Sequence, residues 1–199
     1  MLVFLGAAAL AFGAVFVAEF GDKSQLLILA WATRHPAVPV ILGLVVAAAT
    51  IQGVSVLVGA SIGAVLPGQA VAIVAGLAFL AVAAWTLRGE DDDEDDVSAA
   101  TEGRRRTGLA LVAAVAATFV LGELGDKTML VTFGLAASQG AVATWIGSTL
   151  GEVAANLVAV VVGRQVGARL SPRTVRLGSA ALFAIGGAVV LLGALLGGD

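Results

Sequence analysis

Six apolar stretches, separated by short polar breaks, account for most of this sequence. They cover residues 2–31, 37–62, 69–87, 108–137, 140–163 and 174–196. About 20 mostly apolar residues are enough to cross a lipid bilayer as a helix, and lipid offers the backbone no other way to satisfy its hydrogen bonds. Only 13% of the residues are charged, whereas soluble domains carry about 25%. The sequence therefore predicts an all-α integral membrane protein with six transmembrane helices.

The composition excludes several kinds of site. There is no cysteine and a single histidine, His35, which rules out disulfides, cysteine zinc sites, iron–sulfur clusters and multi-histidine sites within the chain. The net charge of −3 and the distribution of basic residues predict no nucleic-acid partner. The apolar N-terminal segment lacks the positive start of a signal peptide, so we expect it to be retained as the first transmembrane helix.

The polar segment at residues 88–107 carries the acidic run Asp91–Asp96 and the basic run Arg104–Arg106. Such a composition is typical of a solvated linker, although a role in gathering cations at an entrance is an alternative. Trp31, Trp85 and Trp145 lie near the ends of predicted helices, and we expect them to anchor at the membrane interface.

The arginines indicate how the chain is oriented. All nine fall beside the first, third and fifth connections, at Arg34, Arg88, Arg104, Arg105, Arg106, Arg164, Arg169, Arg173 and Arg176. By the positive-inside rule these connections face the cytoplasm. We therefore expect a multi-pass protein of the cell membrane, with a cytoplasmic acidic linker and both termini outside.

The chain also contains an internal repeat. The hexapeptide EFGDKS at residues 19–24 recurs as ELGDKT at residues 123–128, an offset of 123 − 19 = 104 residues. Three predicted helices in each half give the halves opposite orientations in the membrane. We expect residues 1–87 to form the first three-helix repeat, 88–107 the linker, and 108–199 the second, inverted repeat. Inverted repeats are typical of secondary transporters, which bind their substrate near the bilayer midplane between the repeats.

The repeated hexapeptide places charges inside predicted transmembrane helices, where each costs about 2.5–3.5 kcal/mol on insertion scales. Glu19 and Asp22 are three residues apart, as are Glu123 and Asp126, so each pair can project from one helix face. Packing of the two halves about a two-fold axis would bring the four carboxylates together. Carboxylates so placed would repel one another and take up protons.

Two lysines and two hydroxyl residues complete the motifs. Lys23 and Lys127 bring the charge of the two motifs to −4 + 2 = −2, which balances one divalent cation. The carboxylates, with the hydroxyls of Ser24 and Thr128, form an oxygen donor set that suits magnesium, calcium or manganese. A buried network of ion pairs that only holds the helices together is the structural alternative.

Three further polar residues lie in otherwise apolar stretches. Gln52 and Asn156 are related by the 104-residue offset, and each could donate a neutral oxygen to the cation or hydrogen-bond between helices. Glu152 lies one helical turn before Asn156, and its counterpart in the first half is Ala48. It is a candidate fifth carboxylate ligand, a candidate proton site, or the partner of Lys127.

The doubled motif E-x-G-D-K-[ST], complete in both halves, resembles that of the small cation/proton exchanger family typified by the Golgi manganese transporter, within the lysine-exporter superfamily. The resemblance covers the whole chain and implies export of Mn²⁺, or in some members of Ca²⁺, in exchange for protons. It implies that the cation is bound by the acidic motif residues Glu19, Asp22, Glu123 and Asp126.

The same resemblance implies a transporter rather than an enzyme. It implies no cofactor besides the transported divalent cation, and its partners would be the lipid bilayer, the cation and protons. A passive divalent-cation channel and a Ca²⁺/H⁺ exchanger are the alternatives. The sequence does not indicate an oligomeric state.

Overall fold

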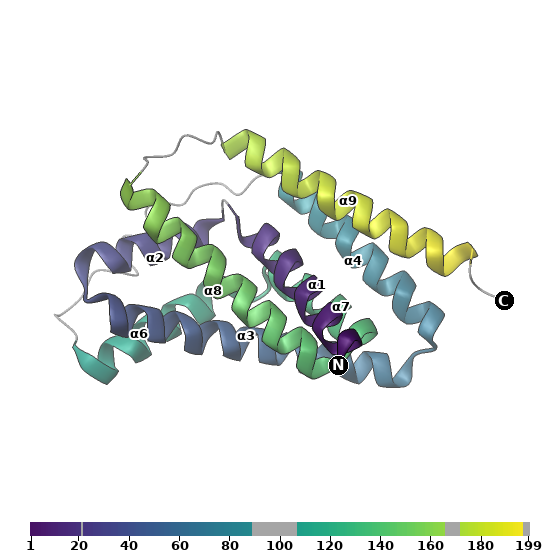
Figure 1. The fold of residues 1–199 in the computed structure, drawn as a ribbon, viewed down its shortest axis with the longest axis horizontal. Helices are drawn as coiled ribbons and strands as arrows, with labels where there is room; N and C mark the ends of the chain where they lie inside the picture. The colour runs from purple at the N-terminus through teal and green to yellow at the C-terminus, as the bar shows by residue number, and fades with distance from the viewer. Residues whose placement is uncertain (21, 89–106, 166–171, 197–199) are drawn as a thin grey trace.

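The computed structural model describes residues 1–20, 22–88, 107–165 and 172–196, and this part of the chain is built from α-helices (Figure 1). The helices are α1 (Leu2–Glu19), α2 (Lys23–Arg34), α3 (Ala37–Val65), α4 (Gly68–Arg88), α6 (Gly108–Glu123), α7 (Lys127–Gln139), α8 (Ala141–Gln165) and α9 (Pro172–Leu196). Five are long and apolar enough to cross a membrane alone, and the bent pair α6 and α7 forms a sixth candidate span. The predicted all-α membrane fold is thereby confirmed.

Some predicted features lie outside the described residues. They are the acidic run, the basic run Arg104–Arg106, Arg169, and the side chains of Lys23, Arg164 and Arg176. The linker expected at residues 88–107 is described only at its two ends.

The first and fourth apolar stretches are both interrupted at the repeated hexapeptide. Three residues separate α1 from α2 and α6 from α7, and α7 is bent by 81° relative to α6. Phe20 (φ −70°, ψ 117°) and Leu124 (φ −62°, ψ 117°) leave the helix with nearly the same backbone conformation. In each break the aspartate N–H donates to the carbonyl of the motif glutamate at 3.1 Å. In the residues that the structure describes, the two copies of the motif therefore share this backbone conformation and this hydrogen bond.

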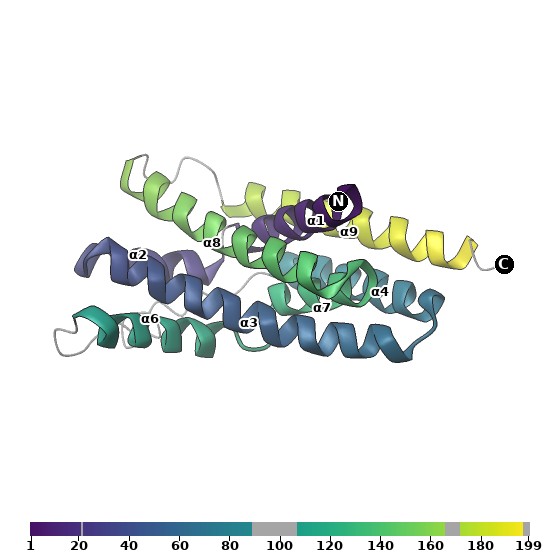
Figure 2. The ribbon, with the colours of Figure 1, turned by 60° about the horizontal axis from the view of Figure 1, so that its bottom comes forward.

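The two halves interlock through matching close contacts, as α1 packs against α8 and α3 packs against α6 (Figure 2). A Cβ atom at Gly147 would clash with the carbonyl oxygen of Ala8, and one at Gly43 would lie 2.9 Å from the carbonyl oxygen of Val112. Glycine at these two positions lets the helix backbones approach closely. Gly147 is 104 residues from Gly43, and Val112 is 104 residues from Ala8. The packing therefore follows the register of the sequence repeat.

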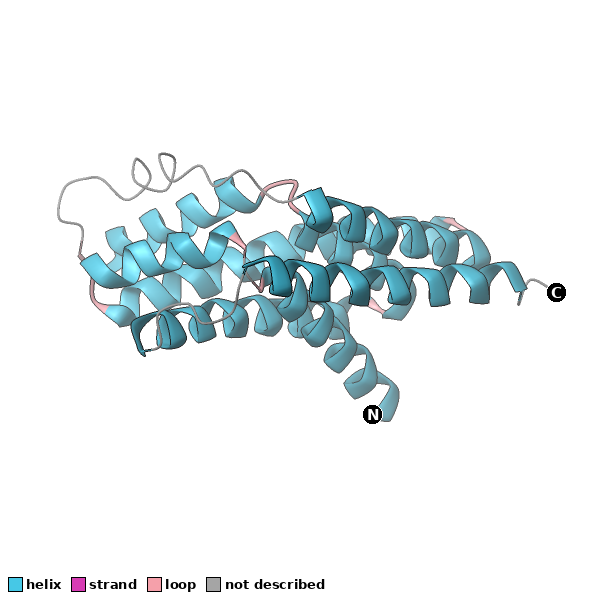
Figure 3. Ribbon diagram, turned by 90° about the horizontal axis from the view of Figure 1, so that it is seen from above, coloured by secondary structure: helices cyan, strands magenta, loops and turns pink. Residues whose placement is uncertain are grey.

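The remaining helices complete the assembly. α4 and α9 pack side by side, α7 packs against both α3 and α4, and α2 packs against α8. Figure 3 shows the N-terminal end of α1 standing away from the other helices. Large apolar side chains are exposed on the outer faces, for example Leu57, Leu121 and Leu195, as expected where helices face lipid rather than water.

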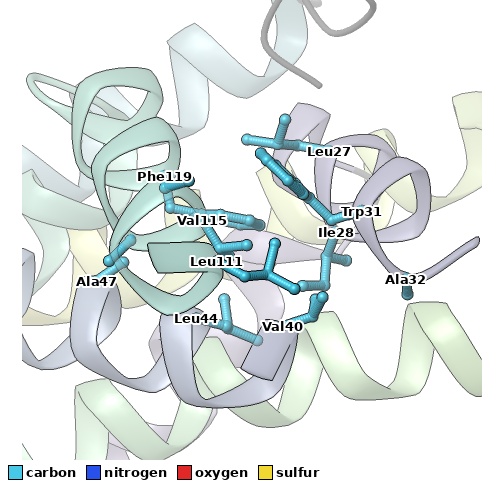
Figure 4. Close-up of a cluster of buried hydrophobic side chains, with 12 residues drawn as sticks. Leu27, Ile28, Trp31, Ala32, Val40, Leu44, Ala47, Leu111, Val115 and Phe119 are labelled. Atoms are coloured by element: carbon cyan, nitrogen blue, oxygen red, sulfur yellow. The ribbon is translucent and has the colours of Figure 1, made fainter. Parts of the chain in front are cut away.

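An apolar cluster fills the space between α2, α3 and α6, and we call it the α2–α3–α6 cluster (Figure 4). It comprises Leu27, Ile28, Trp31, Ala32, Val40, Leu44, Ala47, Leu111, Ala114, Val115, Ala116 and Phe119. Trp31 is only 3% exposed, so the prediction that it anchors at the membrane interface is wrong. Its side chain lies on the face of α2 that packs into the cluster, and its position near the end of a stretch did not reveal which way that face points.

Candidate cation-binding site

Each helix break has an acidic residue on both sides. Glu19 and Glu123 are the last residues of α1 and α6, whereas Asp22 and Asp126 immediately precede α2 and α7. The first N–H groups of α2 and α7 have no partner within the helix and carry a partial positive charge, which favours carboxylates nearby. Asp126 is the N-cap of α7 but its side chain makes no capping hydrogen bond. Gly125 has φ +85°, which glycine adopts without the strain of a side chain.

The structure brings the four motif carboxylates together. Each offers one oxygen, and these four oxygens lie within 4.8 Å of one another. Two ligand oxygens on opposite sides of a hard cation are about 4–5 Å apart, because each metal–oxygen distance is about 2.0–2.6 Å. The spacing therefore allows all four to contact a single ion. All four side chains are at most 4% exposed: Glu19, Asp22, Glu123 and Asp126.

A hydrogen bond and an ion pair hold the acids of the first motif. The Ser24 hydroxyl donates to Glu19 Oε2 at 2.6 Å, and Lys127 Nζ lies 2.9 Å from Asp22 Oδ1. This ion pair joins the two halves, because Lys127 belongs to the second motif and Asp22 to the first. The positive charge of Lys127 reduces the repulsion among the four carboxylates.

Several oxygens around the cluster are buried without a hydrogen-bond donor. They include Glu19 Oε1, Glu123 Oε2, both carboxylate oxygens of Asp126 and the hydroxyl of Thr128. A buried polar atom without a partner costs about 1–3 kcal/mol, and more when it is charged. A cation coordinated by these oxygens would supply the missing partner.

Glu152 lies beside the four-carboxylate cluster rather than within it. Its charge interacts with those of Glu19 and Glu123, but its oxygens are not among the four that lie within 4.8 Å of one another. Gln52 Nε2 donates to Glu152 Oε2 at 2.5 Å, which links α3 to α8. Asn156 Nδ2 donates to the backbone carbonyl of Glu152 at 3.1 Å. The side-chain oxygens of Gln52 and Asn156 are buried without a partner, so both amides keep an oxygen available.

Three buried hydroxyl residues near the site were missed by the sequence analysis. Thr132 of α7 and Thr144 and Ser148 of α8 are fully buried, and the Thr132 hydroxyl donates to Ser148 Oγ at 3.0 Å. Thr144, Ser148 and Glu152 are four residues apart, so they share one face of α8. That spacing of polar residues in an apolar stretch is the signal that could have identified them.

Comparison with known proteins gives two matches to one family, described as "Divalent cation/proton antiporter GDT1", at residues 7–94 and 110–197. A Vibrio cholerae protein named "Putative manganese exporter" is 31% identical over 173 residues, covering 85% of this chain and 82% of the relative. "GDT1-like protein sll0615" of Synechocystis is 30% identical over 184 residues, covering 85% and 88%. "Protein PAM71, chloroplastic" of Arabidopsis thaliana is 29% identical over 204 residues, covering 91% and 55%. No solved structure gives a significant match.

The two family matches together cover most of the chain, and each contains one copy of the acidic motif. The family is one of membrane transporters rather than enzymes, in agreement with the resemblance seen in the sequence. The helices with membrane-spanning length and apolarity are consistent with that assignment. The chain therefore belongs to the GDT1 family of divalent cation/proton antiporters.

Proposed function

We propose that this protein exports Mn²⁺ from the cytoplasm in exchange for protons, and that the four motif carboxylates form the shared binding site. The observation that carries the proposal is the convergence of four buried carboxylate oxygens within 4.8 Å in a member of a divalent cation/proton antiporter family. The name of the Vibrio cholerae relative refers to manganese export, and oxygen ligands suit Mn²⁺.

The donor set suits Mn²⁺. Four carboxylate oxygens with the amide oxygens of Gln52 and Asn156 would give six donors, the number that octahedral Mn²⁺ requires, whereas Ca²⁺ takes six to eight. Ca²⁺/H⁺ exchange is the alternative, because the same atoms also suit that ion. Ser24 and Thr128 have a supporting role, since the Ser24 hydroxyl already holds Glu19.

Exchange follows from the use of one site by both ions. When the cation leaves, four carboxylates remain close together in a poorly solvated region, and protons can neutralise them. Movement of one inverted half against the other would then carry the site between the two faces. The motif acids are almost fully buried, which favours an enclosed exchange site over the continuous polar pore of a passive channel. Glu152 is our candidate for an additional proton site.

The described arginines support the proposed orientation. Arg34 and Arg88 end α2 and α4, and Arg173 lies at the start of α9. The first, third and fifth connections of an alternating six-span arrangement lie on one side of the membrane, which is the cytoplasmic side by the positive-inside rule. We propose that the linker at residues 88–107 is cytoplasmic, that repeats 1–87 and 108–199 flank it, and that both termini are outside.

Reconstitution into proteoliposomes tests the function. Uptake of Mn²⁺, Ca²⁺ and Mg²⁺ would be compared with and without a pH gradient. We expect Mn²⁺ flux that follows the proton gradient and drives counterflow of protons. Flux that ignores the gradient would indicate a channel, and faster Ca²⁺ flux would indicate a Ca²⁺/H⁺ exchanger.

Substitutions in the same vesicles test the site. Glu123→Gln and Asp126→Asn keep the size of each side chain but remove a charge, so we expect Mn²⁺ affinity to fall at least about tenfold, equivalent to about 1.4 kcal/mol, with a strong loss of transport. Thr50→Val is the matched control, because the exposed Thr50 hydroxyl donates only to its own helix, at Val46 O. Normal transport by both acidic variants would reject the four-carboxylate site.

A further inference from the structure

The buried hydroxyls of Thr132, Thr144 and Ser148, which we call the hydroxyl column, lead away from the candidate site. Ser148 lies one helical turn and Thr144 two turns before Glu152, toward the start of α8 at Ala141. The eight residues from Glu152 to Thr144 span about 12 Å at about 1.5 Å per residue. The column therefore extends from beside the cluster almost to the α7–α8 turn.

The hydrogen bonds of the column differ from those of several other hydroxyls on the described helices, although Ser179 also donates across helices, to Val17 O. Thr50, Ser61 and Thr118 each donate to the carbonyl four residues earlier in their own helix. Thr132 instead donates across to Ser148 on the neighbouring helix, and the Thr144 hydroxyl is buried without a partner. These hydroxyls are thus not occupied by their own backbones.

The first half of the chain has apolar residues at the equivalent positions. Subtracting the 104-residue offset from Thr132, Thr144 and Ser148 gives Ile28, Val40 and Leu44. All three belong to the α2–α3–α6 cluster (Figure 4). Apolar side chains therefore meet the packing requirement of this fold at these positions. The hydroxyls in the second half call for a different explanation.

We propose that the hydroxyl column lines the route by which water and the transported ions pass between the site and the membrane face that carries the α7–α8 turn. Hydroxyls both donate and accept hydrogen bonds, so they can hold the water that an apolar wall would exclude. In this structure the α2–α3–α6 cluster fills the equivalent space in the first half with apolar side chains. The column is buried here and becomes hydrated when the halves move, a step that rests on the proposed exchange function. In the proposed orientation the route opens to the outside.

Cysteine accessibility tests this route, because the natural chain has no cysteine. Thr144→Cys and Ser148→Cys would be compared, in reconstituted, transporting protein, with the matched controls Leu135→Cys and Ala143→Cys, which are buried apolar residues close to the same α7–α8 turn. The probe is a charged, membrane-impermeant methanethiosulfonate added to the side of the α7–α8 turn. We expect the first two variants to react at least about tenfold faster, since a thiol buried among apolar groups is inert. Equal rates in the two pairs, or no reaction at Thr144→Cys and Ser148→Cys, would overturn the proposal.

A second measurement separates this proposal from the function on which it rests. Thr144→Val and Ser148→Ala should slow Mn²⁺ transport several-fold while the Mn²⁺ affinity of the detergent-solubilised protein is unchanged. An unchanged transport rate in both variants would overturn the route. Wild-type protein that exchanges Mn²⁺ for protons, but whose cysteine variants never react, would reject only the route. Reactive cysteines in a protein that moves no cation would instead reject the proposed function.

Discussion

Lys127 of the second motif contacts Asp22 of the first, with 2.9 Å between Nζ and Oδ1, and both side chains are buried. A buried ion pair adds little net stability, because the cost of removing both charges from water offsets their attraction. Removing one partner is costly, since it leaves the other charge buried alone. The pair therefore acts mainly by setting the charge of the candidate site and by fixing the position of one half against the other.

The first prediction concerns this ion pair. Lys127→Met should destabilise the protein by about 3–5 kcal/mol and reduce transport strongly, because the site becomes more negative and releases its cation more slowly. Thermal unfolding in detergent and Mn²⁺ binding would measure the two effects. The double variant Lys127→Met/Asp22→Asn should recover much of the lost stability, since the buried charge is also removed. Equal stability of the single and double variants would contradict the coupling of these residues.

The second prediction concerns the contact between α1 and α8. Gly147→Ala should destabilise the protein by about 1–3 kcal/mol, because its Cβ would clash with the backbone carbonyl of Ala8, which cannot rotate away. Gly13→Ala is the matched control, because no atom lies within 4 Å of the added Cβ. Alanine there should be neutral or stabilising, by up to about 1 kcal/mol, from its higher helix propensity. Unfolding followed by tryptophan fluorescence would decide, and similar midpoints for the two variants would argue against the close packing.

The third prediction concerns pH. Protons and Mn²⁺ compete for the same carboxylate oxygens, so proton occupancy rises and apparent Mn²⁺ affinity falls as pH decreases from about 8 to about 6. Glu152→Gln should weaken this dependence more than it weakens binding at the higher pH. Calorimetric Mn²⁺ titrations across the range would test both statements. An affinity that is independent of pH in the natural protein would exclude proton competition, and an unchanged profile in the variant would exclude Glu152 from it.

The fourth prediction separates the two buried amides. Gln52→Leu and Asn156→Leu should both lower Mn²⁺ affinity if their oxygens bind the cation. Only Gln52→Leu also removes a hydrogen bond to the Glu152 carboxylate, a bond to a charged group worth about 1.5–3 kcal/mol. The midpoint temperature of thermal unfolding should therefore fall further for Gln52→Leu than for Asn156→Leu. If both variants bind Mn²⁺ as tightly as the natural protein does, the two amide oxygens are not ligands and only the carboxylates bind the cation.

Much of the fold could be predicted from the sequence, because the bilayer leaves few choices. Apolar stretches of membrane-spanning length must become helices, and the structure has five such helices and one bent pair that could form a sixth span. The register of the repeat also recurs in the packing, since the contacts of Gly43 and Gly147 obey the same 104-residue offset. The sequence also predicted that the four motif carboxylates would meet, and one oxygen from each lies within 4.8 Å of the others.

Only the tertiary structure decided which faces of those helices meet. Trp31 lies near the end of its stretch but is buried in the α2–α3–α6 cluster, and Glu152 is bound by Gln52 from the other half. The hydroxyl column was also invisible as a unit, because Thr132 and Ser148 lie on different helices. Hydropathy determines that a segment is a transmembrane helix, since that depends on the sum of its residues. The partner of a single side chain depends on the rotation and tilt of each helix, and packing between distant segments determines both.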